Sequence, residues 1–314
     1  MKFIEELREG ETITEHYLCK SKKLFKSKAG KNYLALKLYD KTGMIDGKIW
    51  EINSLIQDFN EGDFVKVEAF VGSYNGDLQL TIRRLRRSEK GEYNPNDFIP
   101  STKYSIDEMF DEFKGYIKDI KTPYFRELLT NIFIKDEERA AEFKVHSAAK
   151  HMHHSYMGGL LEHTLSVTKL CMAFADRYKS YVNRDLLITA AMLHDVCKIY
   201  ELSEFPENDY TDKGQLLGHI VMCAELVTEE SRKIKDFPKD AVLLLKHCIL
   251  SHHGEFEFGS PKLPSTLEAF LLYCADNTDA KANMFIEMAD KDTSQGQWLG
   301  YNKILGRNIR RSEL

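Results

Sequence analysis

The chain has 314 residues, and a domain of ordinary size has roughly 150 residues, so this length predicts about two domains. Apolar residues make up 43% of the chain and charged residues 30%, which is typical of a water-soluble protein with a buried core. The formal net charge of −5 excludes a general attraction to nucleic acid or anionic lipid, and no apolar run approaches the ~18 residues of a membrane helix.

Hydrophobic and polar residues alternate along the first 90 positions, which indicates β-strands separated by turn signals such as Asn75-Gly76-Asp77. We predict a short helix over about Glu51–Phe59, between the third and the fourth strand. Five strands with one helix after the third are typical of an OB-fold barrel, a fold that often binds oligonucleotides. The predicted strands are Thr14–Lys26, Tyr33–Tyr39, Met44–Trp50, Phe64–Ser73 and Leu78–Arg84.

Basic and aromatic residues are interleaved in this first segment, and no acidic residue lies between Lys20 and Lys31. Residues 1–90 contain 17 basic and 14 acidic residues, whereas the rest of the chain contains 27 and 35. Proteins that bind single strands combine cations for the backbone with rings for the bases. The competing interpretation is a solvated lysine surface over a barrel whose aromatic residues form its core. We predict RNA contacts by Phe25, Lys31, Tyr33, Trp50, Tyr74, Arg83 and Arg84.

A segment with two prolines and one glycine, residues 91–105, is predicted to link a barrel domain of residues 1–90 to a second domain of residues 106–314. Beyond it the hydrophobic period changes to 3.6, so the fold class is multidomain, with an N-terminal all-β OB-fold barrel and a C-terminal all-α domain. We expect a frayed tail around Arg307, Arg310 and Arg311, with an extension of the basic path as the alternative. The predicted helices are Ser105–Lys118, Pro123–Ile134, Gly159–Tyr178, Arg184–Ile199, Gly214–Ile234, Pro238–His252 and Pro264–Ala289.

The six cysteines include no CxxC pair, and most lie in apolar helical stretches, where free cysteine packs as a small core residue. We therefore expect no disulfides and a reducing compartment. The chain starts MKFIEELREG, with acids where a secretory signal would be apolar. These features predict a cytoplasmic protein without a membrane partner.

Ten of the eleven histidines lie between His146 and His253. Several are flanked by apolar or small residues, as in AAMLHDVCK, and a polar side chain in such a helix face must be hydrogen-bonded or bound to a metal. Imidazole and carboxylate ligands suit divalent ions such as Mn, Fe and Zn, and the absence of nearby thiolates argues against structural zinc. Five histidines and two aspartates exceed the needs of one ion, so we predict two divalent ions, an arrangement used in phosphoester cleavage. The predicted ligands are His163, His194, Asp195, His219, His252, His253 and Asp276.

The order H…HD…D of these residues resembles that of the HD-domain metal-dependent phosphohydrolases, and the additional histidines resemble the two-metal members. The resemblance implies that Asp195 bridges the ions and that Lys198, the lysine of HDxxK, neutralises the scissile phosphate. Whether His253 is a ligand or a supporting hydrogen-bond donor stays open. A metal-bound hydroxide is the expected nucleophile. One ion is expected at His163, His194 and Asp276, and the other at His219 and His252.

The chain resembles the YhaM-type 3′→5′ exoribonucleases in two features. An OB-like domain precedes an HD domain, and the motif HHxxxGGLLEHT precedes the HD dipeptide. This resemblance covers nearly the whole chain. It implies manganese dependence, with Fe²⁺, Co²⁺ and other divalent ions as alternatives, and hydrolysis of single-stranded RNA to nucleoside 5′-monophosphates. Single-stranded DNA as a substrate and a homo-oligomeric state stay open. His154, in the HH of this motif, is predicted to contact the phosphate, with a solvated loop as the alternative.

Two other functions are compatible with the residues. One is a phosphohydrolase of a small nucleotide or cyclic dinucleotide, against which the basic and aromatic barrel argues. The other is a nucleic-acid-binding protein without catalysis, against which the complete ligand set argues. Among the remaining polar residues, Asp279 and Asp290 are expected to be surface or helix-capping groups. His16, His146 and His247 are expected to be hydrogen-bonded core residues.

Overall fold

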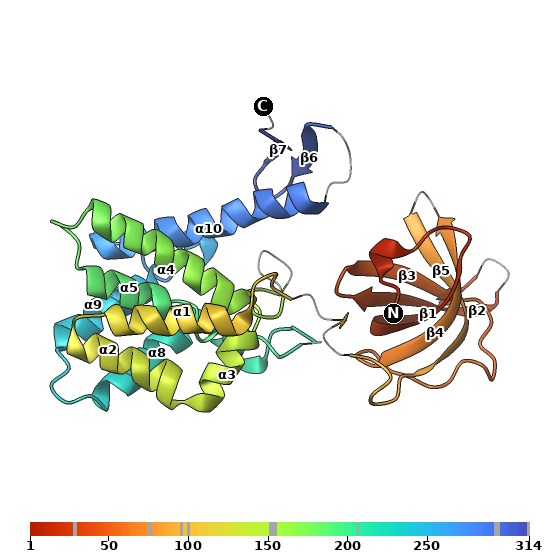
Figure 1. The fold of residues 1–314 in the computed structure, drawn as a ribbon, viewed down its shortest axis with the longest axis horizontal. Coiled ribbons are helices and arrows are strands. Elements are labelled where there is room, and N and C mark those ends of the chain that lie inside the picture. Colours follow the sequence, from red (N-terminus) through yellow and green to blue (C-terminus); the bar gives the residue numbers. More distant parts are fainter. Residues whose placement is uncertain are drawn as a thin grey trace. The chain divides into compact units, whose positions relative to one another are not determined.

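The alternating residues of the N-terminal segment form a closed five-stranded barrel in the computed structural model (Figure 1). The strand order around the barrel is β1-β2-β3-β5-β4, and every neighbouring pair is antiparallel except the parallel pair β3–β5. Alternate side chains point inward, and the interior is filled with Val, Leu and Ile residues that are almost completely buried. The predicted OB-type barrel is therefore confirmed. Its strands are β1 (Thr12–Lys26), β2 (Asn32–Asp40), β3 (Gly43–Ile49), β4 (Phe64–Tyr74) and β5 (Asp77–Arg87).

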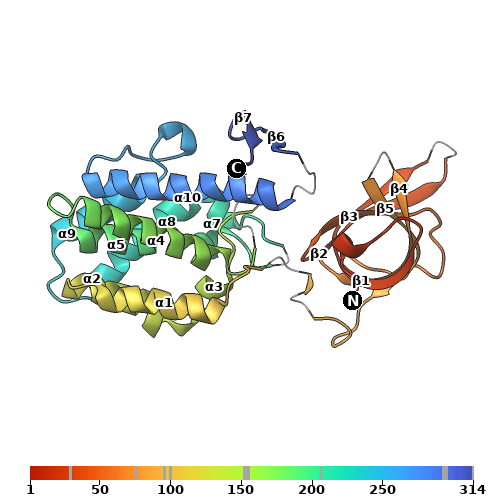
Figure 2. The same cartoon turned by 45° about the horizontal axis from the view of Figure 1, so that its top comes forward.

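The structure describes residues 1–27, 30–74, 77–94, 97–98, 101–150, 156–205, 207–291 and 296–312. They form two compact units, the first mostly Met1–Ser101 and the second made of Thr102–Glu204 and Asn208–Leu314. Figure 2 shows the first unit nearly end-on, so that the closure of the strands into a ring is visible.

The prediction of a short helix over Glu51–Phe59 is wrong, because this segment forms an irregular connection between β3 and β4. The Asn53 side chain accepts a hydrogen bond from the backbone N–H of Leu55 at 2.9 Å, a local bond that competes with helix formation. Ile56 forms an isolated bridge with Leu85 of β5, and Phe59 is buried in the barrel core. Contacts with distant strands therefore determine the path of this segment.

The second unit is helical, as predicted, and Figure 1 shows α4, α5 and α10 packed side by side. Almost every side chain of α5 is buried, which makes this helix the centre of the domain core. No helix is predicted at α3, and the short helices α6 and α7 each overlap one end of a longer predicted helix. The elements are α1 (Ile106–Asp119), α2 (Pro123–Thr130), the π-helical turn η3 (Asn131–Lys135), α3 (Glu137–Val145), α4 (Gly159–Arg177), α5 (Arg184–Leu193), α6 (Lys198–Glu201), α7 (Asp212–Leu216), α8 (Gly218–Arg232), α9 (Lys239–Leu250), the 3₁₀ turn η4 (Phe256–Phe258) and α10 (Leu267–Lys291).

Two predicted helices are interrupted next to a candidate ligand. The helix predicted over Arg184–Ile199 ends at Leu193, and tight turns carry the chain to α6 at Lys198. The helix predicted over Gly214–Ile234 breaks at Gly218, whose φ of +73° is a left-handed conformation that favours glycine. Both interruptions redirect the chain at the point where a histidine follows.

The prediction of a frayed tail near the C-terminus is also wrong. The chain there forms an antiparallel hairpin of β6 (Trp298–Asn302) and β7 (Arg307–Arg310). Elsewhere, all six cysteines carry free thiols. Among the residues that the structure describes, no helix has the length and apolar character needed to cross a bilayer.

Candidate metal centre

The seven predicted ligands converge in the helical unit from five separate stretches of chain. His163 lies in the second turn of α4, and the dipeptide His194-Asp195 occupies the break between α5 and α6. Adjacent residues of a regular helix point about 100° apart, so the break allows both members of this dipeptide to face the same site. The other members are His219 at the start of α8, His252 and His253 after α9, and Asp276 in α10.

The Asp195 carboxylate lies at the centre of these residues, and its two oxygens face different partners. Oδ2 lies 3.4 Å from Nε2 of both His163 and His194. Oδ1 lies 3.2 Å from Nε2 of His219 and 3.6 Å from Nε2 of His252. One carboxylate therefore connects two groups of side chains.

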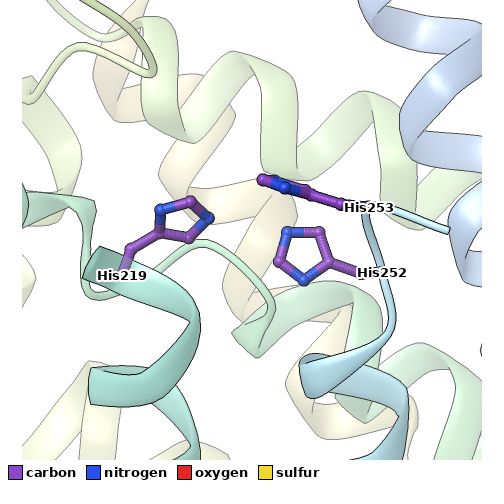
Figure 3. A group of neighbouring side chains, drawn as sticks. All are labelled: His219, His252 and His253. Carbon is purple, nitrogen blue, oxygen red and sulfur yellow. The ribbon is translucent and has the colours of Figure 1, made fainter. Parts of the chain in front are cut away.

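Among the described residues, two sets of three side chains bring their ligand atoms within 4.8 Å of one another. One set is His163, His194 and Asp276, and the other is His219, His252 and His253. Figure 3 shows the second set, with the His219 ring from α8 facing the two rings that follow α9. These sets match the division of ligands expected from the sequence, and they add His253 to the second set.

Each of the five histidines has its Nδ1 within hydrogen-bond distance of an oxygen acceptor, at 2.7–2.9 Å. An Nδ1–H that donates to such an acceptor leaves the lone pair on Nε2, which is the arrangement of a metal-binding imidazole. The site therefore presents Nε2 atoms as candidate ligands. The acceptors, in the order His163, His194, His219, His252 and His253, are Asp279 Oδ2, Ala191 O, Glu201 Oε1, Ile249 O and Phe258 O.

The electrostatics of the site favour bound positive charge. Burial opposes protonation of His219, but the carboxylates of Asp195 and Glu201 outweigh it and raise the pKa of this ring to about 9. Burial also opposes ionisation of Asp195, and Lys198 and His194 outweigh it and hold the pKa of this carboxyl well below its usual range. A divalent cation supplies the same positive charge, and its binding to imidazole displaces protons.

Three buried atoms at the centre of the site have no hydrogen-bond partner within the described part of the chain: Asp195 Oδ1, His219 Nε2 and His252 Nε2. Buried polar atoms are nearly always paired, because an unpaired one costs about 1–3 kcal/mol. Asp195 Oδ1 faces the two Nε2 atoms, at 3.2 Å from His219 and 3.6 Å from His252. Imidazole nitrogen and carboxylate oxygen suit divalent ions, so the residues present fit such an ion.

Sequence reasoning missed two carboxylates that support the site. Asp279 was expected to be a surface or helix-capping group, but it is buried and accepts hydrogen bonds from His163 and Ser166. It lies three residues after Asp276 on α10, and this i,i+3 spacing on one helix face was the available signal. Glu201 accepts hydrogen bonds from both the backbone N–H and Nδ1 of His219, at 3.0 and 2.8 Å. This contact depends on the path of the segment between α6 and α8, which includes α7, and no sequence spacing indicated it.

The structure shows the positions of two further residues singled out in the sequence, Lys198 and His247. Lys198 Nζ lies 2.7 Å from Asp195 Oδ2, so this lysine contacts the centre of the site. His154 lies outside the described residues. His247, expected to be an ordinary hydrogen-bonded residue, accepts a hydrogen bond from the backbone N–H of Ser265 at 2.8 Å.

Three of the residues predicted to bind RNA form one group of contacting rings on the barrel. The ring centroids of Phe25 and Tyr33 are 5.8 Å apart, and those of Tyr33 and Trp50 are 4.8 Å apart. Phe25 and Trp50 are each 46% exposed, so this aromatic group is open to solvent. Lys31 lies at the turn beside it, just before β2.

The remaining predicted RNA contacts are not brought into this aromatic group. Tyr74 ends β4 and is 65% exposed. Arg83 and Arg84 lie on β5, and Arg84 lines a separate cavity of about 320 Å³ together with Lys66 and Glu68.

Comparison with known families defines the class of the protein. Residues 160–281 match the HD domain, and residues 19–87 match an OB-fold nucleic acid binding domain. The chain is thus a two-domain HD protein with an N-terminal nucleic-acid-binding fold. An HD domain with these histidine and aspartate groups binds divalent metal.

Its relatives define the family. The chain is 38% identical to the 3′-5′ exoribonuclease YhaM of Bacillus subtilis over 279 residues, which covers 88% of this chain and 87% of the relative. It is 34% identical to YhaM of Listeria welshimeri, covering 92% and 91%, and 32% identical to YhaM of a Geobacillus species, covering 90% and 86%. The chain belongs to the YhaM family of 3′-5′ exoribonucleases. Among solved structures, the second OB-fold domain of replication protein A from Methanococcus maripaludis covers 29% of the chain and matches over 96% of its own length, with 25% identity and a TM-score of 0.23.

Proposed function

We propose that this protein is a metal-dependent 3′-5′ exoribonuclease whose helical domain binds two divalent ions, with Mn²⁺ the expected metal, on either side of Asp195. The observation that carries this proposal is the position of the Asp195 carboxylate, whose two oxygens face different histidine sets. Membership of the exoribonuclease family supports the activity. Two divalent ions, when bound, supply Lewis acidity toward the phosphate oxygens and lower the pKa of a water molecule.

The side chains around Asp195 would supply the ligands, and two further carboxylates orient two of the rings. His163, His194 and Asp276 would hold one ion, and His219, His252 and His253 would hold the other, with an oxygen of Asp195 directed toward each set. Asp279 and Glu201 fix the rings of His163 and His219 through their Nδ1 atoms. Such partners set both the tautomer and the orientation of a ligand.

Lys198 compensates the negative charge that develops on the phosphate as the terminal phosphodiester is cleaved. Burial disfavours its ammonium form, but the Asp195 carboxylate outweighs burial and raises the pKa of Lys198. The lysine therefore carries a full positive charge at neutral pH beside the position of the substrate phosphate. A fixed charge in a largely buried site stabilises a charged transition state without reorganisation.

The barrel contributes binding of single-stranded RNA through the aromatic group Phe25, Tyr33 and Trp50 and the adjacent Lys31. Exposed rings stack on bases irrespective of sequence, and the lysine contacts the backbone. Tyr74, Arg83 and Arg84 would contact RNA outside this aromatic group, elsewhere on the surface of the barrel. The free thiols fit a reducing compartment, so we assign the protein to the cytoplasm.

The test uses a 5′-labelled single-stranded RNA oligomer incubated with Mn²⁺, with and without chelator. We expect a ladder that shortens from the 3′ end, nucleoside 5′-monophosphates as the product and no shortening in chelator. Elemental analysis of the purified protein should give two metal ions per chain after loading. Hydrolysis of a cyclic dinucleotide with the RNA oligomer left intact would contradict the exoribonuclease activity. A content of one metal ion per chain would contradict the two-ion site.

A further inference from the structure

The C-terminal hairpin, defined as residues 296–312, contains basic and aromatic side chains that the metal centre does not use. It contains four basic residues and no acidic one, although the whole chain has a net charge of −5. It lies beyond residue 281, where the match to the HD domain ends. Figures 1 and 2 show it beside the C-terminal end of α10. Its basic residues are Lys303, Arg307, Arg310 and Arg311.

A β-bulge brings two aromatic residues to one face of the hairpin. The register shifts between Trp298 and Gly300, and Gly300 has a φ of +95°, a left-handed conformation typical of a bulge glycine. Without the shift, Trp298 and Tyr301 would point to opposite faces, because side chains alternate along a strand. With it, Trp298 pairs with Arg310 and Tyr301 pairs with Asn308, and these two pairs share a face.

This aromatic face is held in place by the opposite face of the hairpin. Ile309 points the other way and is only 2% exposed. The Asn302 amide donates to Met288 Sδ at 3.2 Å, and Arg311 donates to the backbone oxygen of Ala289 at 3.0 Å, both near the end of α10. Trp298 and Tyr301 are nevertheless 63% and 60% exposed. Two large rings held exposed on an ordered element mark a binding surface.

Three of the four basic residues of the hairpin form no ion pair with the described residues of the chain. Within the described part of the chain, no carboxylate lies within 4 Å of the charged groups of Lys303, Arg307 or Arg310. Arg307 and Arg310 donate hydrogen bonds to backbone oxygens and to Gln297. In contrast, Arg86 on the barrel forms a bidentate ion pair with Glu92. Arg310 pairs with Trp298, so the hairpin presents a cation beside a stacking surface, the combination that binds single-stranded nucleic acid.

We propose that the hairpin is a second RNA-binding element, located in the helical domain and separate from the barrel, which binds nucleotides upstream of the cleaved 3′ end. This inference rests on the proposed exoribonuclease function. Asp276 and Met288 are 12 residues apart on α10, which corresponds to roughly 18 Å along the helix axis. The hairpin therefore contacts RNA away from the terminal phosphodiester, and its contribution depends on the length of the substrate.

The test compares the double variant Trp298→Ala/Tyr301→Ala and the single variant Arg310→Gln with the unaltered protein. For a long single-stranded RNA we expect the double variant to raise KM roughly tenfold with kcat nearly unchanged. Hydrolysis of bis(p-nitrophenyl) phosphate, which reaches only the metal centre, should not change. Arg310→Gln should reduce the slope of log Kd against log salt concentration by about 0.7.

Matched controls are Tyr181→Ala and Lys179→Gln, which remove an exposed ring and an exposed cation elsewhere in the helical unit. An unchanged KM for long RNA overturns the proposal, as does an equal loss on the small phosphodiester. A change in molar mass by light scattering also overturns it, because the face would then join two copies of the chain. RNA affinity measured by fluorescence anisotropy in the Asp195→Ala background tests the hairpin even if the unaltered protein fails to shorten RNA.

Discussion

The candidate functional residues are buried in the helical unit and exposed on the barrel. In the helical unit, His194 and Asp195 are 0% and 1% exposed, and each contacts several other members of the site. In the barrel, Trp50 and Tyr74 are 46% and 65% exposed and lie on different parts of the surface. Removal of one member of a buried network leaves its partners uncompensated, whereas exposed contacts contribute nearly independently. Substitutions should therefore have large, interdependent effects in the metal centre and small, additive effects on the barrel.

The largest expected effect is that of Asp195→Ala. Loss of the shared carboxylate should reduce hydrolysis of an RNA oligomer by roughly 10³-fold or more, as expected for a residue on which a whole catalytic unit depends. RNA affinity should stay close to that of the unaltered protein, because the binding surfaces are elsewhere. Gel analysis of the 5′-labelled oligomer and fluorescence anisotropy measure the two quantities. Normal turnover would rule out the central role of Asp195.

Lys198→Ala should have the next largest effect. We expect kcat to decrease by about 10²-fold, the usual cost of removing one fixed charge from a transition state. Metal content, measured by elemental analysis, should stay the same because a lysine ammonium cannot be a ligand. Lys179→Ala is the control, since this lysine is exposed in the same unit. If Lys198→Ala changed only KM, the lysine would act in binding rather than in catalysis.

Asp279→Ala tests whether the buried network extends beyond the ligands. Without the acceptor of its Nδ1–H, His163 should lose its fixed orientation, so metal affinity should fall by about 10–100-fold. Isothermal titration with Mn²⁺ measures this affinity directly. Asp290→Ala is a matched control on the same helix, because Asp290 pairs with the exposed Lys103 at 2.7 Å. Equal Mn²⁺ affinities for Asp279→Ala and Asp290→Ala would show that Asp279 does not contribute to metal binding through His163.

The smallest expected effect is that of Trp50→Ala on the barrel. Loss of one stacking ring should raise KM for long RNA by about tenfold, with kcat and the hydrolysis of a small phosphodiester unchanged. Trp50→Phe keeps a ring and should restore most of the affinity. A combined Trp50→Ala/Arg310→Gln variant should show the product of the two single effects. A loss of kcat in Trp50→Ala would contradict the prediction that exposed residues of the barrel contribute to RNA binding independently of the buried metal centre.

Much of the architecture could be predicted because it depends on local periodicity. The five strands were found within a few residues of their bounds, since one face of each strand must fill the barrel. The segment after β3 was mistaken for a helix because its path depends on Leu85 and the barrel core. The C-terminal hairpin was mistaken for a frayed tail because its only strongly buried apolar residue, Ile309, packs in a site formed by the tertiary structure.

The sequence by itself determined the order of the two domains, the family and the identity of seven candidate ligands, because these depend on residue types and their spacing. Only the tertiary structure decided which oxygen of Asp195 faces which histidines, and that Asp279 and Glu201 orient two of the rings. It also decided that Trp298 and Tyr301 share one exposed face. The reason is that these arrangements depend on interruptions of regular structure, at His194, Gly218 and Gly300, where long-range packing outweighs local periodicity.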